Sequence, residues 1–498
     1  MNHLRSLREY IDALQALGDV QPIDLEVDWN LELGAIIRRS YDLKAPAPLF
    51  NRIKGYENSG FRVLGAPAAL SSRHDMPLAR IALGLGLQPQ ASGQEIVEAI
   101  VAARERKPIT HRIVERHSAP CKQNIRMGDE VDVLTFPTPW IHGNDGGRFI
   151  QTYGMNIAQT PDGTWTNYSI NRMMIVDKNR LSCLIPPPQH FGMIRSQWKA
   201  RGEPMPVALA LGVEPGLALM GGLPLPKDVD ESMFLAAYFG EPLEMVRAES
   251  VDLLVPATAE IVIEGHISVA DDDMAVEGPM NEYPGYIATE AVPKPVFHIS
   301  AITWRDNAIL PVVAAGPPVE EDHTVTGAMH AAEILYELRR AGLPVASCWF
   351  SFESALHWLI VAANSDWHAR LNVDSSEFAR QIAHIIFASK AGFGVPKILL
   401  VEDDVDITAL EDVVWAFATR THPAHGEIHF PDQDNVGLYV YLDEKEKRSW
   451  RSTKVIHNCL LADRYTEGNR PMKGSFENGW PDAVRNKVLS SWKEYGYE

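Results

Sequence analysis

Two carboxylates, Glu277 and Glu282, stand five residues apart in a segment that also holds two glycines and two prolines, residues 277–286. Because proline removes a backbone donor and fixes φ, this composition predicts a loop with a defined path. Paired carboxylates in different surroundings can supply an acid and a base at neutral pH. A rigid surface turn with two solvated acids is the alternative, since most loop acids have no catalytic role. Other polar segments of the chain decide between the two interpretations.

A second polar segment, residues 163–172, carries Asn167, Ser169, Asn171 and Arg172 after a turn at Gly163. In a strand, alternate side chains share a face, so the two asparagines and the serine point one way. Arg172 points the other way unless a bulge intervenes. Inside a barrel, such a face suits a polar ligand. A strand that faces solvent is the alternative.

Three further side chains have the types that bind a divalent ion. Residues 185–190 read Ile-Pro-Pro-Pro-Gln-His, and the prolines make a stiff, extended lead-in to Gln189 and His190. An asparagine oxygen, a histidine nitrogen and a carboxylate, from Asn167, His190 and Glu231, suit Mn²⁺ or Mg²⁺ better than Zn²⁺. Their long spacing leaves a purely structural histidine as the alternative. The histidine-rich segment 422–429 is broken by proline and glycine, so we expect a surface loop there.

Composition limits the function classes. The formal net charge is −19, from 46 basic and 65 acidic residues, which excludes binding to a nucleic-acid backbone or to an anionic membrane. We also expect no membrane span, because the sequence shows no apolar stretch of that length. The N-terminal segment predicts an amphipathic helix and not a signal peptide. Four scattered cysteines indicate a cytoplasmic protein with reduced thiols.

A chain of 498 residues predicts two or three domains. Helical and strand-like segments alternate at first, which predicts an α/β unit over residues 1–114. Short strand-like runs separated by turn residues then predict a barrel or sandwich over residues 115–310, with the polar segment 165–176 as one of its strands. Residues 311–498 return to an α/β pattern, with a helix at 329–341 closed by Gly342, another capped at Ser375 or Ser376, and a terminal helix at 481–492.

Together these segments resemble a known family, the UbiD family of reversible decarboxylases, and most of all its ferulic and cinnamic acid decarboxylase branch. The resemblance runs nearly end to end. It rests on residues 145–147, 151–155, 159–163, 167–172, 187–190, 277–286, 390–392 and 415–420, together with Glu231. The family implies an N-terminal α/β unit, a central split β-barrel that binds a flavin, and a C-terminal α/β domain that mediates dimerisation.

The resemblance also implies cofactors. These are prenylated FMN, made by a separate UbiX-type prenyltransferase, with Mn²⁺ (or Mg²⁺) and K⁺ at its phosphate. Carried over by position, the divalent-metal ligands are Asn167, His190 and Glu231. The residues that hold the flavin are Ser169, Ile170, Asn171, Arg172, Gln189 and Lys390, together with those three ligands. The monovalent ion is expected near Met220, Leu223, Glu231 and Arg420.

The implied reaction is decarboxylation through a covalent adduct between the substrate and the prenylated flavin. Arg172, Glu277 and Glu282 form the catalytic network: Arg172 orients the substrate carboxylate, Glu277 holds Arg172, and Glu282 protonates the carbon that lost CO₂. Because Glu282 must be protonated at that moment, we expect burial to raise its pKa.

The pocket departs from the branch that it resembles. Thr326 and Val436 stand where the branch places larger apolar groups, and Tyr283 stands where it carries a smaller side chain; Thr152 and Gln189 complete the expected pocket. A wider cavity favours a bulky or polycyclic (hetero)aromatic acid, such as a phenazine carboxylate. A cinnamic or ferulic type of acid is the alternative. Two other classes stay open: a flavin-binding barrel without carboxyl chemistry, and a non-catalytic subunit.

Overall fold

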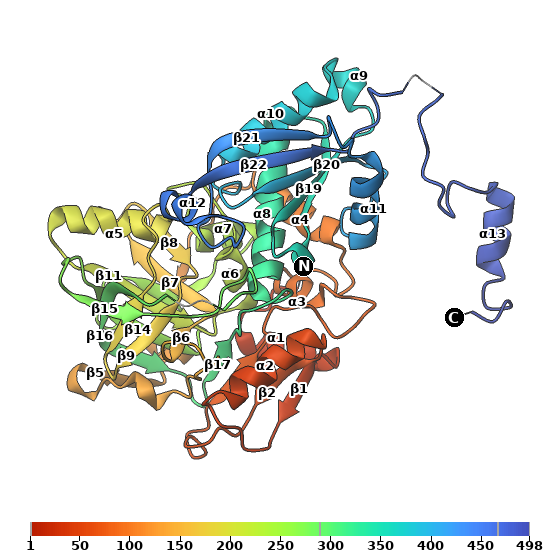
Figure 1. The fold of residues 1–498 in the computed structure, drawn as a ribbon. Coiled ribbons are helices and arrows are strands. Elements are labelled where there is room, and N and C mark those ends of the chain that lie inside the picture. Colours follow the sequence, from red (N-terminus) through yellow and green to blue (C-terminus); the bar gives the residue numbers. More distant parts are fainter. Residues whose placement is uncertain (1, 288–289, 466–467, 498) are drawn as a thin grey trace.

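The computed structural model describes residues 2–287, 290–465 and 468–497. Figure 1 shows three regions: an N-terminal α/β unit at the bottom, a sheet-rich central domain on the left, and a C-terminal α/β domain at the top. This mixed α/β architecture confirms the predicted fold class. No helix in these described ranges is long and apolar enough to cross a membrane.

The N-terminal sheet has the strand order β1-β2-β3-β17. Strand β17 follows the central domain in the sequence, so the chain returns to this sheet after that domain. The strands are β1 (Val20–Ile23), β2 (Ala47–Phe50), β3 (Arg62–Gly65) and β17 (Ile309–Val312); the helices of this region are α1 (Leu7–Ala16), α2 (Glu32–Asp42), α3 (Ala79–Gly84) and α4 (Gly93–Ala103). Helix α1 begins where Ser6 accepts a hydrogen bond from the Glu9 amide, and it buries one apolar stripe.

The central domain is built on a largely antiparallel sheet of order β6-β9-β10-β16-β14-β11-β7-β8, with β5 and β15 also paired to β16. Its strands are β5 (Asn124–Met127), β6 (Phe149–Gln151), β7 (Gly154–Gln159), β8 (Thr166–Ser169), β9 (Met173–Asp177), β10 (Arg180–Cys183), β11 (Met205–Leu211), β14 (Ile261–Ile267), β15 (Met274–Glu277) and β16 (Val292–Trp304). Beside it lie helices α5 (His190–Arg201), α6 (Pro215–Met220) and α7 (Glu231–Phe239), and a small sheet of β4 (Arg112–Ile113), β12 (Glu244–Arg247) and β13 (Leu254–Pro256).

The C-terminal sheet has the order β18-β19-β20-β22-β21. Its strands are β18 (Val345–Phe350), β19 (Trp358–Ala363), β20 (Lys397–Glu402), β21 (Glu427–Asp434) and β22 (Arg451–Asn458); its helices are α8 (Glu321–Arg340), α9 (Trp367–Leu371), α10 (Ser375–Ala388), α11 (Leu410–Arg420), α12 (Glu444–Ser449) and α13 (Asp482–Ser490). The histidine-rich segment expected as a loop is therefore a loop only up to Gly426, and it continues as β21. The cap of α10 is Asp374 rather than Ser375 or Ser376.

Helix α8 is longer than its sequence predicted. We expected a start near Met329, but the helix begins at Glu321, after Glu320 accepts a hydrogen bond from the Asp322 amide. The extra turns contain threonine, valine and glycine, which favour helix weakly. Tertiary packing compensates, because a Cβ on Gly327 would lie only 2.7 Å from the Phe352 ring. One core cluster joins α4 of the N-terminal region to α8 and β18.

Candidate functional site

The first of the paired acids, Glu277, is the last residue of β15, and the loop that follows carries Glu282. Gly278 and Gly285 both adopt positive φ, +83° and +89°, which side chains rarely tolerate. A Cβ on Gly285 would also lie 2.9 Å from Pro317 Cα. The defined loop path expected from the sequence is therefore present, and glycine is required at both of its bends.

Both acids of this loop meet Arg172. The Arg172 Nε atom donates to Glu277 Oε1 at 2.7 Å, and Nη2 lies 3.3 Å from Glu277 Oε2. The Nη1 atom pairs with Glu282. Side-chain exposure is 1% for Glu277 and 23% for Glu282, so only the second acid is open to a ligand. The rigid surface turn with two solvated acids is excluded.

Arg172, Glu277 and Glu282 form a triad in which charge and burial shift the pKa values of Arg172 and Glu282 in opposite directions. Burial raises the pKa of Glu282 above its ordinary value, although the nearby Arg172 charge lowers it. Burial alone would lower the pKa of Arg172, but the two glutamates outweigh it and the net shift is upward. The triad therefore combines a permanent cation with a carboxyl group whose pKa is raised above its ordinary value.

The polar segment 165–176 is two strands, not one. β8 ends at Ser169 and β9 begins at Met173. Side chains form the break: Ser169 Oγ donates to Asn171 Oδ1 at 2.8 Å, and Asn156 Nδ2 donates to the Asn171 carbonyl at 2.8 Å. Asn171 and Arg172 therefore lie in a connection, which frees Arg172 from the alternation of a regular strand. Asn171 in turn donates to Gln189 Oε1 at 3.0 Å.

The three candidate metal ligands sit on different elements that converge. Asn167 lies in β8, His190 is the first residue of α5, and Glu231 is the first residue of α7. Asn167 Nδ2 donates to Glu231 Oε1 at 2.9 Å, and the Tyr168 amide donates to Oε2 at 2.8 Å. The Asn167 Oδ1 atom is buried and has no hydrogen-bond partner among the described residues.

Lys390 contacts His190, and its charge acts on Glu231. Its ammonium lies 3.1 Å from His190 Nδ1 and donates to the Leu225 carbonyl at 3.2 Å. Burial raises the pKa of Glu231 to about 8 and lowers that of Lys390 to about 8. Burial and the Lys390 charge lower the pKa of His190 to about 4, so its ring is neutral at physiological pH. Ile170 lies nearby, 3.0 Å from where a Cβ on Gly221 would stand.

No three His, Cys, Asp or Glu side chains in the described part of the chain gather where they could hold a metal ion. The trio of Asn167, His190 and Glu231 has two residues of those types, and its third ligand is an amide. The residues expected to surround the monovalent ion, each of which the structure describes, do not all have contacts with one another. The Met220 carbonyl accepts from the Leu223 amide at 3.0 Å, next to Leu225. Arg420 instead pairs with Asp404 at 2.7 Å and lies over Trp415, within the C-terminal domain.

The expected substrate-pocket residues occupy several elements. Tyr283 follows Glu282 in the loop, and its hydroxyl lies 3.3 Å from that of Tyr439. Val436 Cγ2 lies 3.4 Å from where a Cβ on Gly394 would stand, and the Tyr439 hydroxyl donates to the Gly394 carbonyl. Tyr283 and Val436 therefore meet the same C-terminal segment. Thr326 is half-buried on α8, and Thr152 accepts from the Val313 amide at 3.0 Å.

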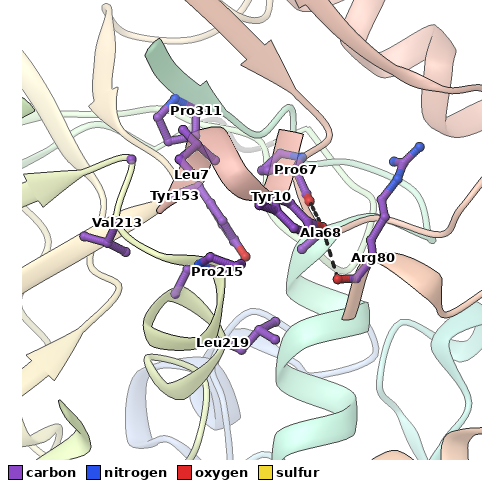
Figure 2. A pocket seen from close by; sticks show the side chains of 12 residues that line it. Leu7, Tyr10, Pro67, Ala68, Arg80, Tyr153, Val213, Pro215, Leu219 and Pro311 are labelled. Atoms are coloured by element: carbon purple, nitrogen blue, oxygen red, sulfur yellow. Dashed lines mark hydrogen bonds between the residues drawn. The ribbon is translucent and has the colours of Figure 1, made fainter. Parts of the chain in front are cut away.

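Two residues that support the loop were missed in the sequence. Tyr439 contacts Tyr283 from 156 positions away, and His323 Nε2 donates to the Tyr283 carbonyl at 2.8 Å. No local spacing signals either contact. The cavity drawn in Figure 2 is a different place: it has a volume of about 10 Å³ and is lined by Leu7, Tyr10, Tyr153 and Leu219 among others. It contains none of the candidate site residues.

The antiparallel central domain and an arginine held between two glutamates are the features that we expected of a carboxy-lyase, and comparisons with known proteins give the same class. Three family models match in order: the N-terminal domain of 3-octaprenyl-4-hydroxybenzoate carboxy-lyase over residues 11–100, its Rift-related domain over 112–318, and its C-terminal domain over 323–459. The chain belongs to the UbiD family of carboxy-lyases.

Two curated relatives span almost the whole chain. Pyrrole-2-carboxylic acid decarboxylase of Pseudomonas aeruginosa is 42% identical over 490 residues, which are 98% of each chain. Ferulic acid decarboxylase 1 of Saccharomyces cerevisiae is 36% identical over 502 residues, covering 100% of this chain and 99% of the relative.

Among solved structures, the UbiD-class enzyme HmfF of Pelotomaculum thermopropionicum, in complex with FMN, superposes with a TM-score of 0.78 at 26% identity. The match covers 95% of this chain and 98% of HmfF. Vanillic acid decarboxylase of Sedimentibacter hydroxybenzoicus, at 23% identity and a TM-score of 0.83, shares the fold over 97% of this chain and 99% of its own.

Proposed function

We propose that this protein is a reversible, non-oxidative decarboxylase of aromatic, heteroaromatic or α,β-unsaturated carboxylic acids that uses prenylated FMN. The observation that carries the proposal is Arg172, held between Glu277 and Glu282 in a chain of this family. The similar relatives act on pyrrole-2-carboxylic acid and ferulic acid by their names. An evolved form of HmfF binds prenylated FMN at 26% identity.

Each side chain of the triad has a distinct role in the proposed reaction. Arg172 binds the substrate carboxylate and orients it, because a guanidinium offers paired donors in a fixed geometry. Glu277 fixes Arg172 from its buried side. Glu282 donates a proton from its carboxyl oxygen to the carbon that lost CO₂, which requires the protonated form that burial favours. When bound, prenylated FMN supplies the electron sink for the pair released as CO₂ leaves.

The residues around Glu231 fit the cofactor's phosphate and its metal. The partnerless Asn167 oxygen, the neutral His190 ring and the Glu231 carboxylate are the oxygen and nitrogen donors that Mn²⁺ or Mg²⁺ accepts. Lys390 adds a cation beside His190, and Ser169, Ile170, Asn171 and Gln189 complete the binding surface. We keep K⁺ near Met220, Leu223 and Glu231 as part of the proposal. Arg420 is the least supported of the proposed K⁺ residues, because its hydrogen bonds are to Asp404 within the C-terminal domain.

Changing Glu231 to glutamine should remove the divalent ion and most of the bound flavin while the fold is kept. Glutamine preserves the shape, and its single amide oxygen can accept one of the two hydrogen bonds that Asn167 and the Tyr168 amide donate to Glu231, but it loses the charge that a divalent ion requires. The measurement is metal content by mass spectrometry together with flavin absorbance after purification. Glu203→Gln, an exposed site, is the control. Full metal and flavin content in Glu231→Gln would contradict the metal assignment.

The proposed substrate is a bulky or polycyclic (hetero)aromatic acid, such as a phenazine carboxylate, because Thr326 and Val436 are small. Co-expression with a UbiX-type prenyltransferase, mass spectrometry of the released cofactor and a CO₂-release screen test the function. A prenylated flavin with turnover of polycyclic acids supports it in full. Turnover of cinnamic or ferulic acids alone would keep the class and discard the size argument. Plain FMN without CO₂ release would favour the flavin-binding alternative.

We further propose that the chain forms a homodimer through its C-terminal region. Helix α13 stands away from the rest of the molecule (Figure 1), and none of its described residues, 482–490, is buried. Large apolar side chains are exposed along this arm: Met472, Trp480, Leu489, Trp492 and Tyr497. Such apolar surface is typical of a segment that packs on another chain.

Deleting residues 475–498, which keeps the ion pairs of Arg470 and Lys473 with the C-terminal domain, should convert a dimer into a monomer, because the arm's apolar side chains would lose their contacts on the second copy. Sedimentation velocity of the full chain and the deletion variant measures this. As a control, Lys487→Ala and Lys493→Ala change charge on the arm and should leave the dimer intact. A full-length monomer, or an unchanged dimer after deletion, would argue against the arm as the interface.

A further inference from the structure

The first half of helix α8 has one side that solvent reaches, termed the open face, and its other sides are buried. Among residues 321–330, all of which the structure describes, only Asp322, Thr326 and His330 are not buried. They are spaced four apart, so they lie on one side of the helix. Thr326 is a proposed pocket residue, so this open face is the part of α8 that can meet a substrate.

The two ends of this face reach the two ends of the proposed site. His323, next to Asp322, donates to the Tyr283 carbonyl at 2.8 Å, directly after the proton donor Glu282. His330 Nδ1 donates to the Ala391 carbonyl at 3.1 Å, beside the cofactor residue Lys390. The open face therefore begins at Asp322, next to the residue that contacts the acid loop, and ends at His330, which contacts the cofactor side.

Asp322 differs from the acids on either side of it. Glu321 accepts from the Ala68 and Ala69 amides at 3.0 Å, and Glu320 accepts from the Asp322 amide at 2.8 Å. These two carboxylates have structural roles. Within the described part of the chain, the Asp322 carboxyl group has no hydrogen-bond or ion-pair partner, and solvent reaches it.

Asp322 is exposed to solvent, and the protein around it still shifts its pKa. Surrounding protein raises its pKa well above the ordinary value, and the charges of Glu320 and Glu282 add to that rise. Asp322 acts in the same way on the pKa of Tyr283, although burial is the larger cause there. An acid that interacts with both Glu282 and Tyr283 is close to where the proposed reaction takes place.

We propose that Asp322 is a specificity-determining residue of this enzyme, whose carboxyl oxygen accepts a hydrogen bond from an N–H or O–H on the substrate ring. The inference rests on the proposed function and narrows its substrate class. A site built around a polar group rejects analogues that leave this group unpaired. Ring nitrogens of a phenazine carboxylate accept but do not donate, so an acid with a ring N–H ranks above it.

Matched substrate pairs that differ only at this donor test the proposal. Pyrrole-2-carboxylate and furan-2-carboxylate form a small pair, and indole-2-carboxylate and benzofuran-2-carboxylate form a larger one. We expect the enzyme loaded with prenylated FMN to prefer the N–H member by about 10- to 100-fold in kcat/KM, the range of one hydrogen bond to a charged group. Asp322→Ala should bring this ratio close to one, and Asp322→Asn, which keeps one acceptor oxygen and the shape, should reduce it partly.

Asp12→Ala, which removes an exposed carboxyl group on α1, is the matched control. Asp12 lies outside the proposed site, so this variant should leave the ratio unchanged. An unchanged ratio in Asp322→Ala, with CO₂ still released, would overturn the inference and leave the proposed function intact. Calorimetric binding of the same pairs to Glu282→Gln needs no turnover. If no acid releases CO₂, the proposed function fails. The ratio of the affinities for the two members of each pair, measured in Glu282→Gln with and without Asp322→Asn, still supports or overturns the role of Asp322.

Discussion

Glu282→Gln should abolish CO₂ release while the protein keeps its fold and its bound flavin. The proposed proton to the departing carbon comes from this carboxyl group, and a general acid contributes about 10²- to 10⁴-fold to a rate. Glutamine keeps the shape and can still accept from Arg172, so the position of the loop is preserved. Steady-state CO₂ release over many turnovers, with flavin absorbance as the check on loading, measures the effect, because CO₂ leaves before the proton transfer. The control is Glu290→Gln, which changes an exposed acid eight residues after Glu282 and should retain full activity.

The same residue predicts the pH profile. Burial raises the pKa of Glu282, and the protonated form is the active one. Activity is therefore full below this raised pKa and falls as the pH rises through it. The rate of Glu282→Gln, where any remains, should not show this basic limb, because glutamine does not titrate. A basic limb that persists unchanged in the variant would assign the proton donor to another group.

The sequence predicted the elements of this site better than their connections. Proline and glycine marked the acid loop, and the two positive-φ glycines confirm why that composition was needed. The residue types of Asn167, Ser169 and Asn171 indicated a polar face. The break between β8 and β9 was missed because side chains make it: Asn156 reaches the Asn171 carbonyl from a neighbouring strand, and no local pattern reports such a contact.

Long-range contacts explain the other differences. The first turns of α8 are poor helix formers, and they are helical because Gly327 packs on Phe352, which the chain supplies 25 positions later. Tyr439 meets Tyr283 across 156 positions. Asp322 is one of three consecutive acids in the sequence, and only the fold separates the two bonded carboxylates from the open one. Residue type and spacing predict which groups are available, and tertiary structure decides which of them are free to act.

Arg172→Lys should lower kcat/KM by about 10²-fold or more, with a small change in stability. A lysine ammonium keeps the positive charge but lacks the planar fork that bonds Glu277 through two nitrogens and Glu282 through a third. Charge-assisted hydrogen bonds of this kind contribute about 1.5–3 kcal/mol each, and the loss of one accounts for roughly that change in rate. Rates at saturating and at limiting substrate concentration give kcat and kcat/KM. A fall in kcat reports poorer orientation of the substrate carboxylate, and a rise in KM reports weaker binding of it.

Arg172→Met separates catalysis from stability. Methionine leaves the carboxylate of Glu277, whose side chain is 1% exposed, without its cation, and unpairing a buried charge costs about 3–5 kcal/mol. Adding Glu277→Gln removes that unpaired charge, so the double variant should recover most of the lost stability. It should recover none of the activity, because the substrate carboxylate still lacks its guanidinium. Denaturant unfolding and CO₂ release on the two single variants and the double variant complete this cycle. Recovery of both quantities together would mean that Arg172 acts only as a structural partner of Glu277.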